Sequence, residues 1–371
     1  MFQPRSIQSS LNFRDKIFSI DYILVLSILV LGIVSMFAMY STDGGEFKYH
    51  TVSHIIRFCV FFLMFFILSF VQIRFWHSSS YLIYFFFLFL LIGVKYFGIT
   101  ASGSQRWLDL PFINLQPSEL MKVGLILFLA KYYHRIPIES VNRLKFLFTP
   151  IFVLIFPVLL VIMQPDLGTS LLIASGGLVV AWLAGVRVKF FAYSLLIFIA
   201  LLPIAISFLK PYQKARILTF LNPEKDPLGV AYQIIQSKTA IGSGGLFGKG
   251  WGQGTQTHLK FLPVQESDFI LSVIGEELGF VTIAMVLLII GYFIMQIIRF
   301  AYLSKDRFSS LALIGIATIF LSHVFINTAM TVGLIPVKGL PFPFISAGGS
   351  FLITSFLMTG IVLKLSGNYT D

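Results

Sequence analysis

The chain of 371 residues contains few charged residues and almost no cysteine. Asp, Glu, Lys and Arg make up 12% of the sequence, whereas hydrophobic residues make up 57%. A composition this apolar is outside the range of soluble domains and is typical of a polytopic membrane protein. The one cysteine, Cys59, lies in an apolar run, so a disulfide within this chain is excluded.

Three other patterns are missing. The opening segment MFQPRSIQSSLNFRDK runs into a full-length apolar span with no small-residue cleavage site, so we expect the first span to be retained as an anchor. No internal repeat is visible, which weakens the case for a transporter built from inverted halves without excluding it. No low-complexity linker divides the chain, and we expect one membrane domain over residues 1–371.

Nucleotide-binding loops are absent as well, although the segment IGSGGLFGKGWGQGTQ is rich in glycine. A P-loop in register with Gly248 and Lys249 would need Gly and Ser/Thr at positions held by Ser243 and Gly250. The dinucleotide pattern fails at Phe247, where its third glycine would fall. We therefore expect no nucleotide cofactor.

Two interpretations of this glycine-rich segment stay open. The glycines could let backbone amides approach an anion, with Lys238 and Lys249 supplying positive charge. Alternatively, they form a flexible or tightly turned surface loop.

The sequence that is present is dominated by apolar runs long enough to span a bilayer. We predict an all-α polytopic membrane protein with ten transmembrane helices and a large extracytoplasmic loop, residues 210–267, between the seventh and eighth. The fourth run is short and carries charged residues, which makes it the weakest span by hydropathy. The ten runs lie at residues 21–40, 55–71, 81–97, 117–133, 147–163, 167–184, 190–209, 268–298, 311–334 and 344–365.

The distribution of lysine and arginine predicts the orientation. If the N-terminus is cytoplasmic, most of the lysines and arginines fall in the segments on the inner side, and the short outer segments contain only a few. This distribution favours both termini inside. The net charge of +11 is then mostly positive-inside bias. We therefore expect no nucleic-acid partner.

The segment LPVQESDFILSVIGEELG combines an acidic residue with the start of a membrane-length helix. From Asp268, helical spacing puts Ser272, Gly275, Glu276 and Gly279 on one small, polar face. A charged group in a bilayer helix normally faces a protein interior or a wet cavity, so we expect this face to point into the fold. Asp268 could act as a proton acceptor at the membrane surface, or it could N-cap its helix, and both roles can hold together.

Other polar residues lie at membrane depth. Glu119 falls in the first turn of its helix, where the helix dipole stabilises a carboxylate, and Lys122 is three residues on, close enough to pair with it. Asp166 begins the sixth span and could simply cap it. His323 and Asn327 share one face of the ninth span, which favours interhelical hydrogen bonding.

The motif GSQRWLDL contributes two more candidates. Trp107 lies where aromatic belts lie, and an interfacial anchor is the default role for such a tryptophan. Arg106 beside it could bind a substrate phosphate or a lipid headgroup.

Six motifs together resemble one family. GSQRWLDL, QPSELMK, QPDLGTS, YQIIQSKTAIGSGGLFGKG, FLPVQESDFILSVIGEELG and GLIPVKGLPFPFISAGGS occur in the order and spacing of the SEDS proteins (shape, elongation, division and sporulation). The resemblance covers nearly the whole chain and is greater to the elongation-type branch, RodA, than to the division-type branch, FtsW. Two departures are QESDF, where many relatives carry His and Thr before the aspartate, and SAGGS, where a tyrosine is common before the glycines.

The resemblance implies a peptidoglycan glycosyltransferase that polymerises lipid II for cell elongation and rod shape. It implies inverting displacement of a lipid diphosphate with Asp268 as general base, and for such a displacement a single carboxylate can suffice. Mg²⁺ or Mn²⁺, with ligands that the sequence does not identify, or the cations of the chain would neutralise the diphosphate. Substrate contacts are expected at Arg106, Trp107, Glu119, Lys122, Asp166, Lys238, Lys249, Glu276, Ser346, Gly348 and Gly349.

The resemblance also implies a location and partners. We expect the bacterial cytoplasmic (inner) membrane, a class B penicillin-binding protein as transpeptidase partner, other proteins of the elongation complex, and membrane lipids. Small residues of the ninth span, Gly315, Ala317 and Ser322, are a candidate docking surface for the partner's helix. Two other function classes stay open: a lipid II flippase, and a non-catalytic scaffold of the elongation complex.

Overall fold

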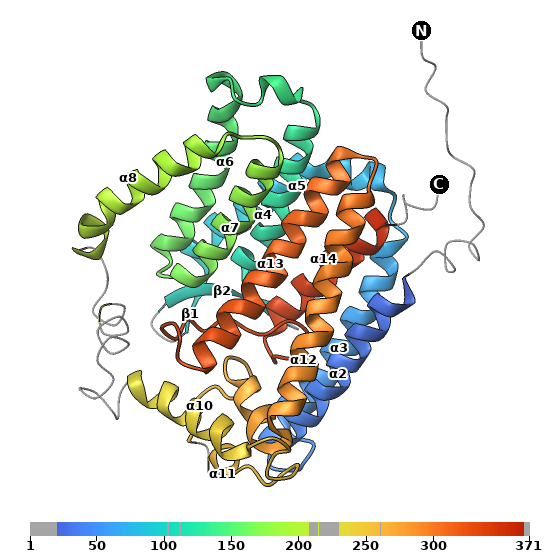
Figure 1. Ribbon diagram of the computed structural model, residues 1–371, viewed down its shortest axis with the longest axis vertical. Coiled ribbons are helices and arrows are strands. Elements are labelled where there is room, and N and C mark those ends of the chain that lie inside the picture. Colours follow the sequence, from blue (N-terminus) through green and yellow to red (C-terminus); the bar gives the residue numbers. More distant parts are fainter. Residues whose placement is uncertain are drawn as a thin grey trace.

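The structure, a computed structural model, describes residues 21–101, 104–110, 113–207, 230–259 and 261–366, together with Lys214. These residues form a helical bundle with one small sheet (Figure 1), which confirms the predicted all-α polytopic class. The predicted single domain over 1–371 extends beyond the described residues at both ends and stays a prediction. The helices are α2 (Tyr22–Thr42), α3 (Tyr49–Ser69), α4 (Ile73–Phe97), α5 (Pro117–His134), η1 (Ile138–Ser140), α6 (Leu144–Met163), α7 (Leu167–Leu183), α8 (Val188–Ser207), α10 (Val230–Gly244), α11 (Thr255–His258), α12 (Ile270–Leu303), α13 (Arg307–Thr331) and α14 (Gly349–Ser366).

Each of the ten predicted runs coincides with one of these helices. Seven of them, α2, α3, α4, α6, α12, α13 and α14, are long and apolar enough to cross a membrane. α7 is shorter, as is the apolar part of α8, and α5 carries three charged residues. The protein is therefore multi-pass, while the count of ten crossings stays a prediction. The starts of α3, α4 and α14 differ most from the predicted starts. α3 and α4 begin earlier because polar residues extend them, and α14 begins later because residues 344–348 form a turn before it.

α5 runs through the middle of the bundle. It packs against α4, α7, α13 and α14, and all of its residues except Tyr132 and His134 are buried. A helix surrounded by protein does not need to be apolar toward lipid, so it can carry polar and charged side chains. This position explains why the least apolar predicted span lies at the centre.

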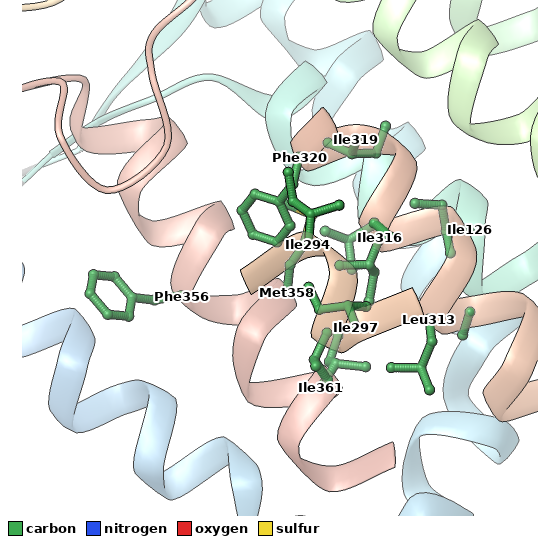
Figure 2. Close-up of a cluster of buried hydrophobic side chains, with 14 of the residues drawn as sticks. Ile126, Ile294, Ile297, Leu313, Ile316, Ile319, Phe320, Phe356, Met358 and Ile361 are labelled. Carbon is green, nitrogen blue, oxygen red and sulfur yellow. The ribbon is translucent and has the colours of Figure 1, made fainter. Parts of the chain in front are cut away.

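α5 and the helices around it share one apolar core. Figure 2 shows Ile126 of α5, Ile294 of α12, Ile316 of α13 and Phe356 of α14 in this cluster. Because lipid tails are as apolar as these side chains, close packing contributes more here than removal from water does.

Small residues of α13 take part in this packing. A Cβ on Gly315 would lie 2.7 Å from Ile126 and 2.8 Å from Val180, and Ala317 is buried. Ser322 approaches Ser175 of α7, with 3.4 Å between the hydroxyl oxygens. These residues face the bundle, so the prediction that Gly315 and Ala317 form a docking surface for a partner helix is wrong.

A small sheet that was not predicted lies between α4 and α5. Strands β1 (Ile99–Ala101), β2 (Ser104–Leu110) and β3 (Ile113–Leu115) are antiparallel in the order β1-β2-β3. The Ser350 hydroxyl of α14 donates to the Asn114 carbonyl (2.5 Å) and accepts from the Gln116 amide (2.9 Å). This contact fixes the end of the sheet, and the start of α5, against α14.

Within the predicted outer loop, the described residues form α10, α11 and a set of turns at the lower end of Figure 1. α10 packs along α12, where the Ser237 hydroxyl bonds to the Ser272 hydroxyl and the Thr331 carbonyl, both at 2.7 Å. The described part of the loop is therefore held against the bundle.

The glycine-rich segment lies on a break in α12. Gly279 has φ 82° and ψ 177°, which interrupts the helix. The Glu276 and Glu277 carbonyls, which this break leaves without a helical partner, accept hydrogen bonds from the Lys249 and Gly250 amides, both at 3.0 Å. The tightly turned interpretation of this segment is therefore the one that the structure supports.

Candidate active site

A polar cavity of about 450 Å³ lies where the sheet, α10 and the starts of α5, α7, α12 and α14 meet. Six of the predicted site residues line it: Arg106, Trp107, Glu119, Asp166, Asp268 and Gly348. Residues far apart in sequence thus converge on one polar space at one end of the bundle.

Asp268 lies in a turn that several contacts hold in place. Its amide donates to the Val264 carbonyl at 3.1 Å, and its own carbonyl accepts from the Asn327 side chain at 3.0 Å. The Ser267 hydroxyl donates to Oδ1 at 3.2 Å, and a Cβ on Gly339 would lie 3.1 Å from Oδ2. The N-cap of α12 is Phe269, so Asp268 precedes the cap position instead of occupying it.

Asp166 has two roles in the structure. It caps α7, since Oδ1 accepts from the Thr169 amide at 3.0 Å, which confirms the capping interpretation. Its Oδ2 also accepts from the side-chain amide nitrogen of Gln116 and from an Arg106 guanidinium nitrogen, both at 3.1 Å. The cap therefore also orients Arg106 on the cavity wall.

Glu119 and Lys122 form the predicted pair, with 2.6 Å between Nζ and Oε2. Lys122 has no exposed surface, and its Nζ is also 2.8 Å from Nε2 of His323. The other His323 nitrogen lies 3.2 Å from the Pro341 carbonyl. Glu119 reaches the cavity wall, whereas Lys122 lies behind it, so the pair links the cavity to α13.

Ser346 supports the site from outside the wall. Its hydroxyl donates to the Ser267 carbonyl at 2.6 Å and accepts from the Phe342 amide at 2.8 Å. Gly349 begins α14 and Lys238 is exposed on α10, and neither lines the cavity.

Lys249 and Glu276, predicted to contact substrate, bond to each other instead at 2.8 Å. Glu276 is fully buried and also accepts from Thr255, Gln256 and Thr257. The polar face of α12 points into the fold as predicted, but α10 and the glycine-rich segment cover it. The face is polar because it binds this segment.

The wall also contains polar residues that were not among the predicted contacts, including Gln116, Gln233 and Lys338. Gln116 and Lys338 belong to the motifs QPSELMK and IPVKGLPFP, so the motifs themselves were the available signal. Gln233 reaches the cavity only because α10 packs on the bundle.

The described residues contain no group of three or more His, Cys, Asp or Glu side chains placed to hold a metal ion. Magnesium commonly keeps several waters and uses one or two carboxylates together with substrate phosphates. The donor set around the cavity therefore does not fit a resident ion held by protein ligands alone, and it fits only a cation that arrives with a phosphorylated substrate.

Comparisons with known proteins identify the family of the chain. The family model described as cell cycle protein, FtsW/RodA/SpoVE, matches residues 15–370. The chain is similar to the peptidoglycan glycosyltransferase MrdB of Escherichia coli K12, at 36% identity over 95% of each chain. It is also similar to the stage V sporulation protein E of Bacillus subtilis, at 34% identity over 93% of this chain and 96% of the relative.

Solved structures share the fold. One from a peptidoglycan synthase complex that coordinates polymerization and crosslinking has a TM-score of 0.80 at 28% identity, over 95% of this chain and 99% of the other. The Thermus thermophilus rod shape determining protein RodA has a TM-score of 0.72 at 25% identity, over 95% and 98%. The match over nearly the full length, with six motifs in order, shows that the chain belongs to the FtsW/RodA/SpoVE family of cell cycle proteins.

Proposed function

We propose that the chain is a peptidoglycan glycosyltransferase that polymerises lipid II into glycan strands. The observation that carries this assignment is a carboxylate, Asp268, held on the wall of a polar cavity that also presents Arg106 and Lys338. A base beside cations suits transfer of a sugar away from a diphosphate. The similarity to MrdB, itself named a peptidoglycan glycosyltransferase, supports the same activity.

The reaction needs one proton acceptor. The acceptor sugar's C4 hydroxyl gives its proton to the Asp268 carboxylate as its oxygen bonds to the donor's anomeric carbon. The bond from that carbon to the lipid diphosphate breaks in the same displacement, which inverts the configuration. The diphosphate leaves with its charge neutralised by cations, and Arg106 and Lys338 are the ones on the wall. Lys122 forms an ion pair with Glu119 and acts by holding that carboxylate in place.

Mg²⁺ or Mn²⁺, when bound, would supply further positive charge to the diphosphate. We place this ion with the substrate, since the cavity offers only separated carboxylates. Asp268 and Asp166 are the carboxylates on the wall that could complete its shell.

A flippase would have to open the bundle to the other side of the membrane. At the opposite end of the bundle, Arg307 donates to the Ala184 carbonyl at 2.9 Å and to the Ile136 carbonyl at 2.5 Å. Asn142 bonds to the Gly185 carbonyl and the Arg187 amide, and the core of Figure 2 fills the space between. These contacts tie α5, α7 and α13 together, which favours a cavity that works from one face.

The same proposal includes location and partnership. We place the chain in the bacterial cytoplasmic membrane with both termini inside and the cavity at the outer face, as the lysine and arginine distribution indicates. A class B penicillin-binding protein would crosslink the strands within the elongation complex, in line with the synthase complex whose fold this chain shares.

The test is polymerisation of lipid II by the purified protein, with and without the partner. Asp268→Asn keeps the shape of the side chain but cannot take the proton, so we expect strand synthesis to fall by about 100-fold or more while the protein stays folded. Gel analysis of labelled glycan measures the product, and thermal unfolding measures the fold. Normal synthesis by this variant would remove Asp268 from the mechanism.

A further inference from the structure

An apolar cavity of about 260 Å³ lies at the other end of the bundle from the polar cavity, between the ends of α5 and α7 and the first halves of α6 and α8. α8 slants away from α6 and α7 in Figure 1, so the cavity lies in the angle between α8 and the bundle. Leu129, Leu154 and Leu178 form its wall on the bundle, and Phe190 and Ile197 of α8 line the other side. Because lipid tails are as apolar as these side chains, a hollow of this kind at membrane depth suits a hydrocarbon chain.

Tyr133 of α5 adds one polar group to this apolar wall. Its side chain lines the cavity and is 1% exposed, and no atom of the described residues bonds to its hydroxyl. The hydroxyl oxygen keeps a small accessible surface, unlike the enclosed Ser355 hydroxyl of α14. Since buried hydroxyls are nearly always hydrogen-bonded, this one is placed to donate to a ligand. Leu129 lies one turn deeper in α5, so the hydroxyl is nearer to the end of the bundle than the hydrocarbon part of the cavity is.

Basic residues surround the end of the bundle beside this cavity. Four of them are exposed at the starts of α6 and α8: Arg143, Lys145, Arg187 and Lys189. The Asn142 side chain joins these two helix starts, since it donates to the Gly185 carbonyl at 3.0 Å and accepts from the Arg187 amide at 2.8 Å. No described carboxylate forms an ion pair with any of the four. Glu139 is the one acidic residue in segments 135–147 and 184–197, so positive charge is in excess here.

We propose that this cavity binds an anionic glycerophospholipid of the adjoining membrane leaflet. One acyl chain fills the apolar space, an ester carbonyl accepts from the Tyr133 hydroxyl, and the phosphate lies beside the basic residues. From the depth of the cavity to the end of the bundle, the protein thus presents apolar wall, hydroxyl and cations in the order in which a phospholipid presents chain, ester and phosphate. Basic pockets between transmembrane helices bind anionic headgroups in this way.

A second copy of the chain is a poorer occupant. It would bring the same four basic residues toward this face, and like charges repel each other. The inference concerns a lipid site at the end of the bundle away from Asp268, so it does not depend on the proposed polymerase activity.

The test is lipid titration of the full-length protein in detergent, measured by native mass spectrometry. Phosphatidylglycerol and phosphatidylcholine with the same acyl chains are compared, and we expect phosphatidylglycerol to bind more tightly. A basic residue near an anionic headgroup contributes about 1 kcal/mol, or about fivefold in affinity. The charge variant, Arg187→Gln with Lys189→Gln, should therefore weaken phosphatidylglycerol binding about thirtyfold and leave phosphatidylcholine binding unchanged. Arg74→Gln with Arg299→Gln is the matched control, because both residues are exposed at the same end of the bundle on helices that do not line the cavity.

Tyr133→Phe removes only the hydroxyl and should weaken both lipids by about threefold to tenfold, because both have ester carbonyls. Its melting temperature without added lipid should not change, since the hydroxyl has no partner among the described residues. Tyr302→Phe, at an exposed position near the end of α12, is the control and should bind both lipids normally. The charge variant alters exposed side chains only, so it keeps the test valid if Tyr133→Phe folds poorly.

Three results would overturn the inference. The first is equal affinity of the unchanged protein for the two lipids, or no binding of either. The second is unchanged phosphatidylglycerol binding by the charge variant or by a folded Tyr133→Phe protein. The third is a dimer that carries no lipid, which would assign the cavity to a second copy of the chain.

Discussion

Lys122 is a fully buried cation whose ammonium is held between Glu119 and His323. Removing one member of a buried ion pair leaves the other charge without compensation, which costs about 3–5 kcal/mol. We predict that Lys122→Ala strongly lowers both stability and activity. Glu119→Ala with Lys122→Ala should be less harmful than the two single losses added together.

A double-mutant cycle on the melting temperature and on strand synthesis measures this coupling. The coupling energy for residues in contact is about 0.5–3 kcal/mol. Strictly additive losses would show that the 2.6 Å contact carries no energy. Ser355→Ala is the control, because Ser355 is also fully buried and, among the described residues, its hydroxyl bonds to neither Glu119 nor Lys122.

At the scale of single residues, the sequence predicted the site best where a charge lies at membrane depth. Asp268, Glu119 and Asp166 stand out because a charged side chain in an apolar run needs a reason to be there. Gln233 does not stand out, since polar residues in outer segments are ordinary. Its place on the cavity wall depends on how α10 packs, which no local pattern encodes.

At the scale of elements, Gly279 decides how α12 meets the glycine-rich segment. Its φ of 82° with ψ 177° belongs to a region that only glycine adopts readily, and a Cβ there would overlap the Gly248 amide and the Leu246 carbonyl. We predict that Gly279→Ala costs at least about 1–3 kcal/mol from backbone strain alone. The glycine-rich segment should detach from α12 and become accessible to protease.

Gly291 provides the matched control within the same helix. A Cβ at Gly291 would meet nothing within 4 Å, and its backbone is helical. Gly291→Ala should therefore leave both the melting temperature and the protease pattern unchanged. Equal behaviour of the two variants would mean that the break at Gly279 has no structural role.

Hydropathy predicted the membrane helices well because each gives a long, continuous signal. The three-stranded sheet was missed, since strands as short as Ile99–Ala101 have no measurable periodicity. Helical periodicity in α12 correctly grouped Ser272 and Glu276 on one buried face. It could not say whether a ligand or another segment of the chain would cover that face, because either occupant selects polar residues.

At the scale of the whole molecule, the proposed cation should be needed for turnover and not for folding. No described cluster holds an ion with three protein side chains. We predict that EDTA stops strand synthesis, that Mg²⁺ restores it, and that the melting temperature of the substrate-free protein does not change. A fall of several degrees on chelation would reveal a resident structural ion and contradict the placement of the ion with the substrate.

α12 also fixes the height of Asp268 above the bilayer. From Phe280 to Leu303 the helix is about 36 Å long at 1.5 Å per residue, slightly more than the roughly 30 Å of a hydrocarbon layer. The part of α12 beyond Gly279 can therefore cross the hydrocarbon layer on its own. Ile270 and the preceding Asp268 then lie outside that layer, at a height that the length of the helix fixes.

A lipid-borne diphosphate lies at the headgroup level, so bilayer thickness sets its distance from the Asp268 carboxylate. We predict that turnover in vesicles of increasing acyl length passes through a maximum, since both thin and thick bilayers misalign carboxylate and diphosphate. The measurement is strand synthesis at constant headgroup composition and constant protein density. A flat profile would mean that tilting of α12 absorbs the mismatch and that the enzyme can meet its substrate at any depth.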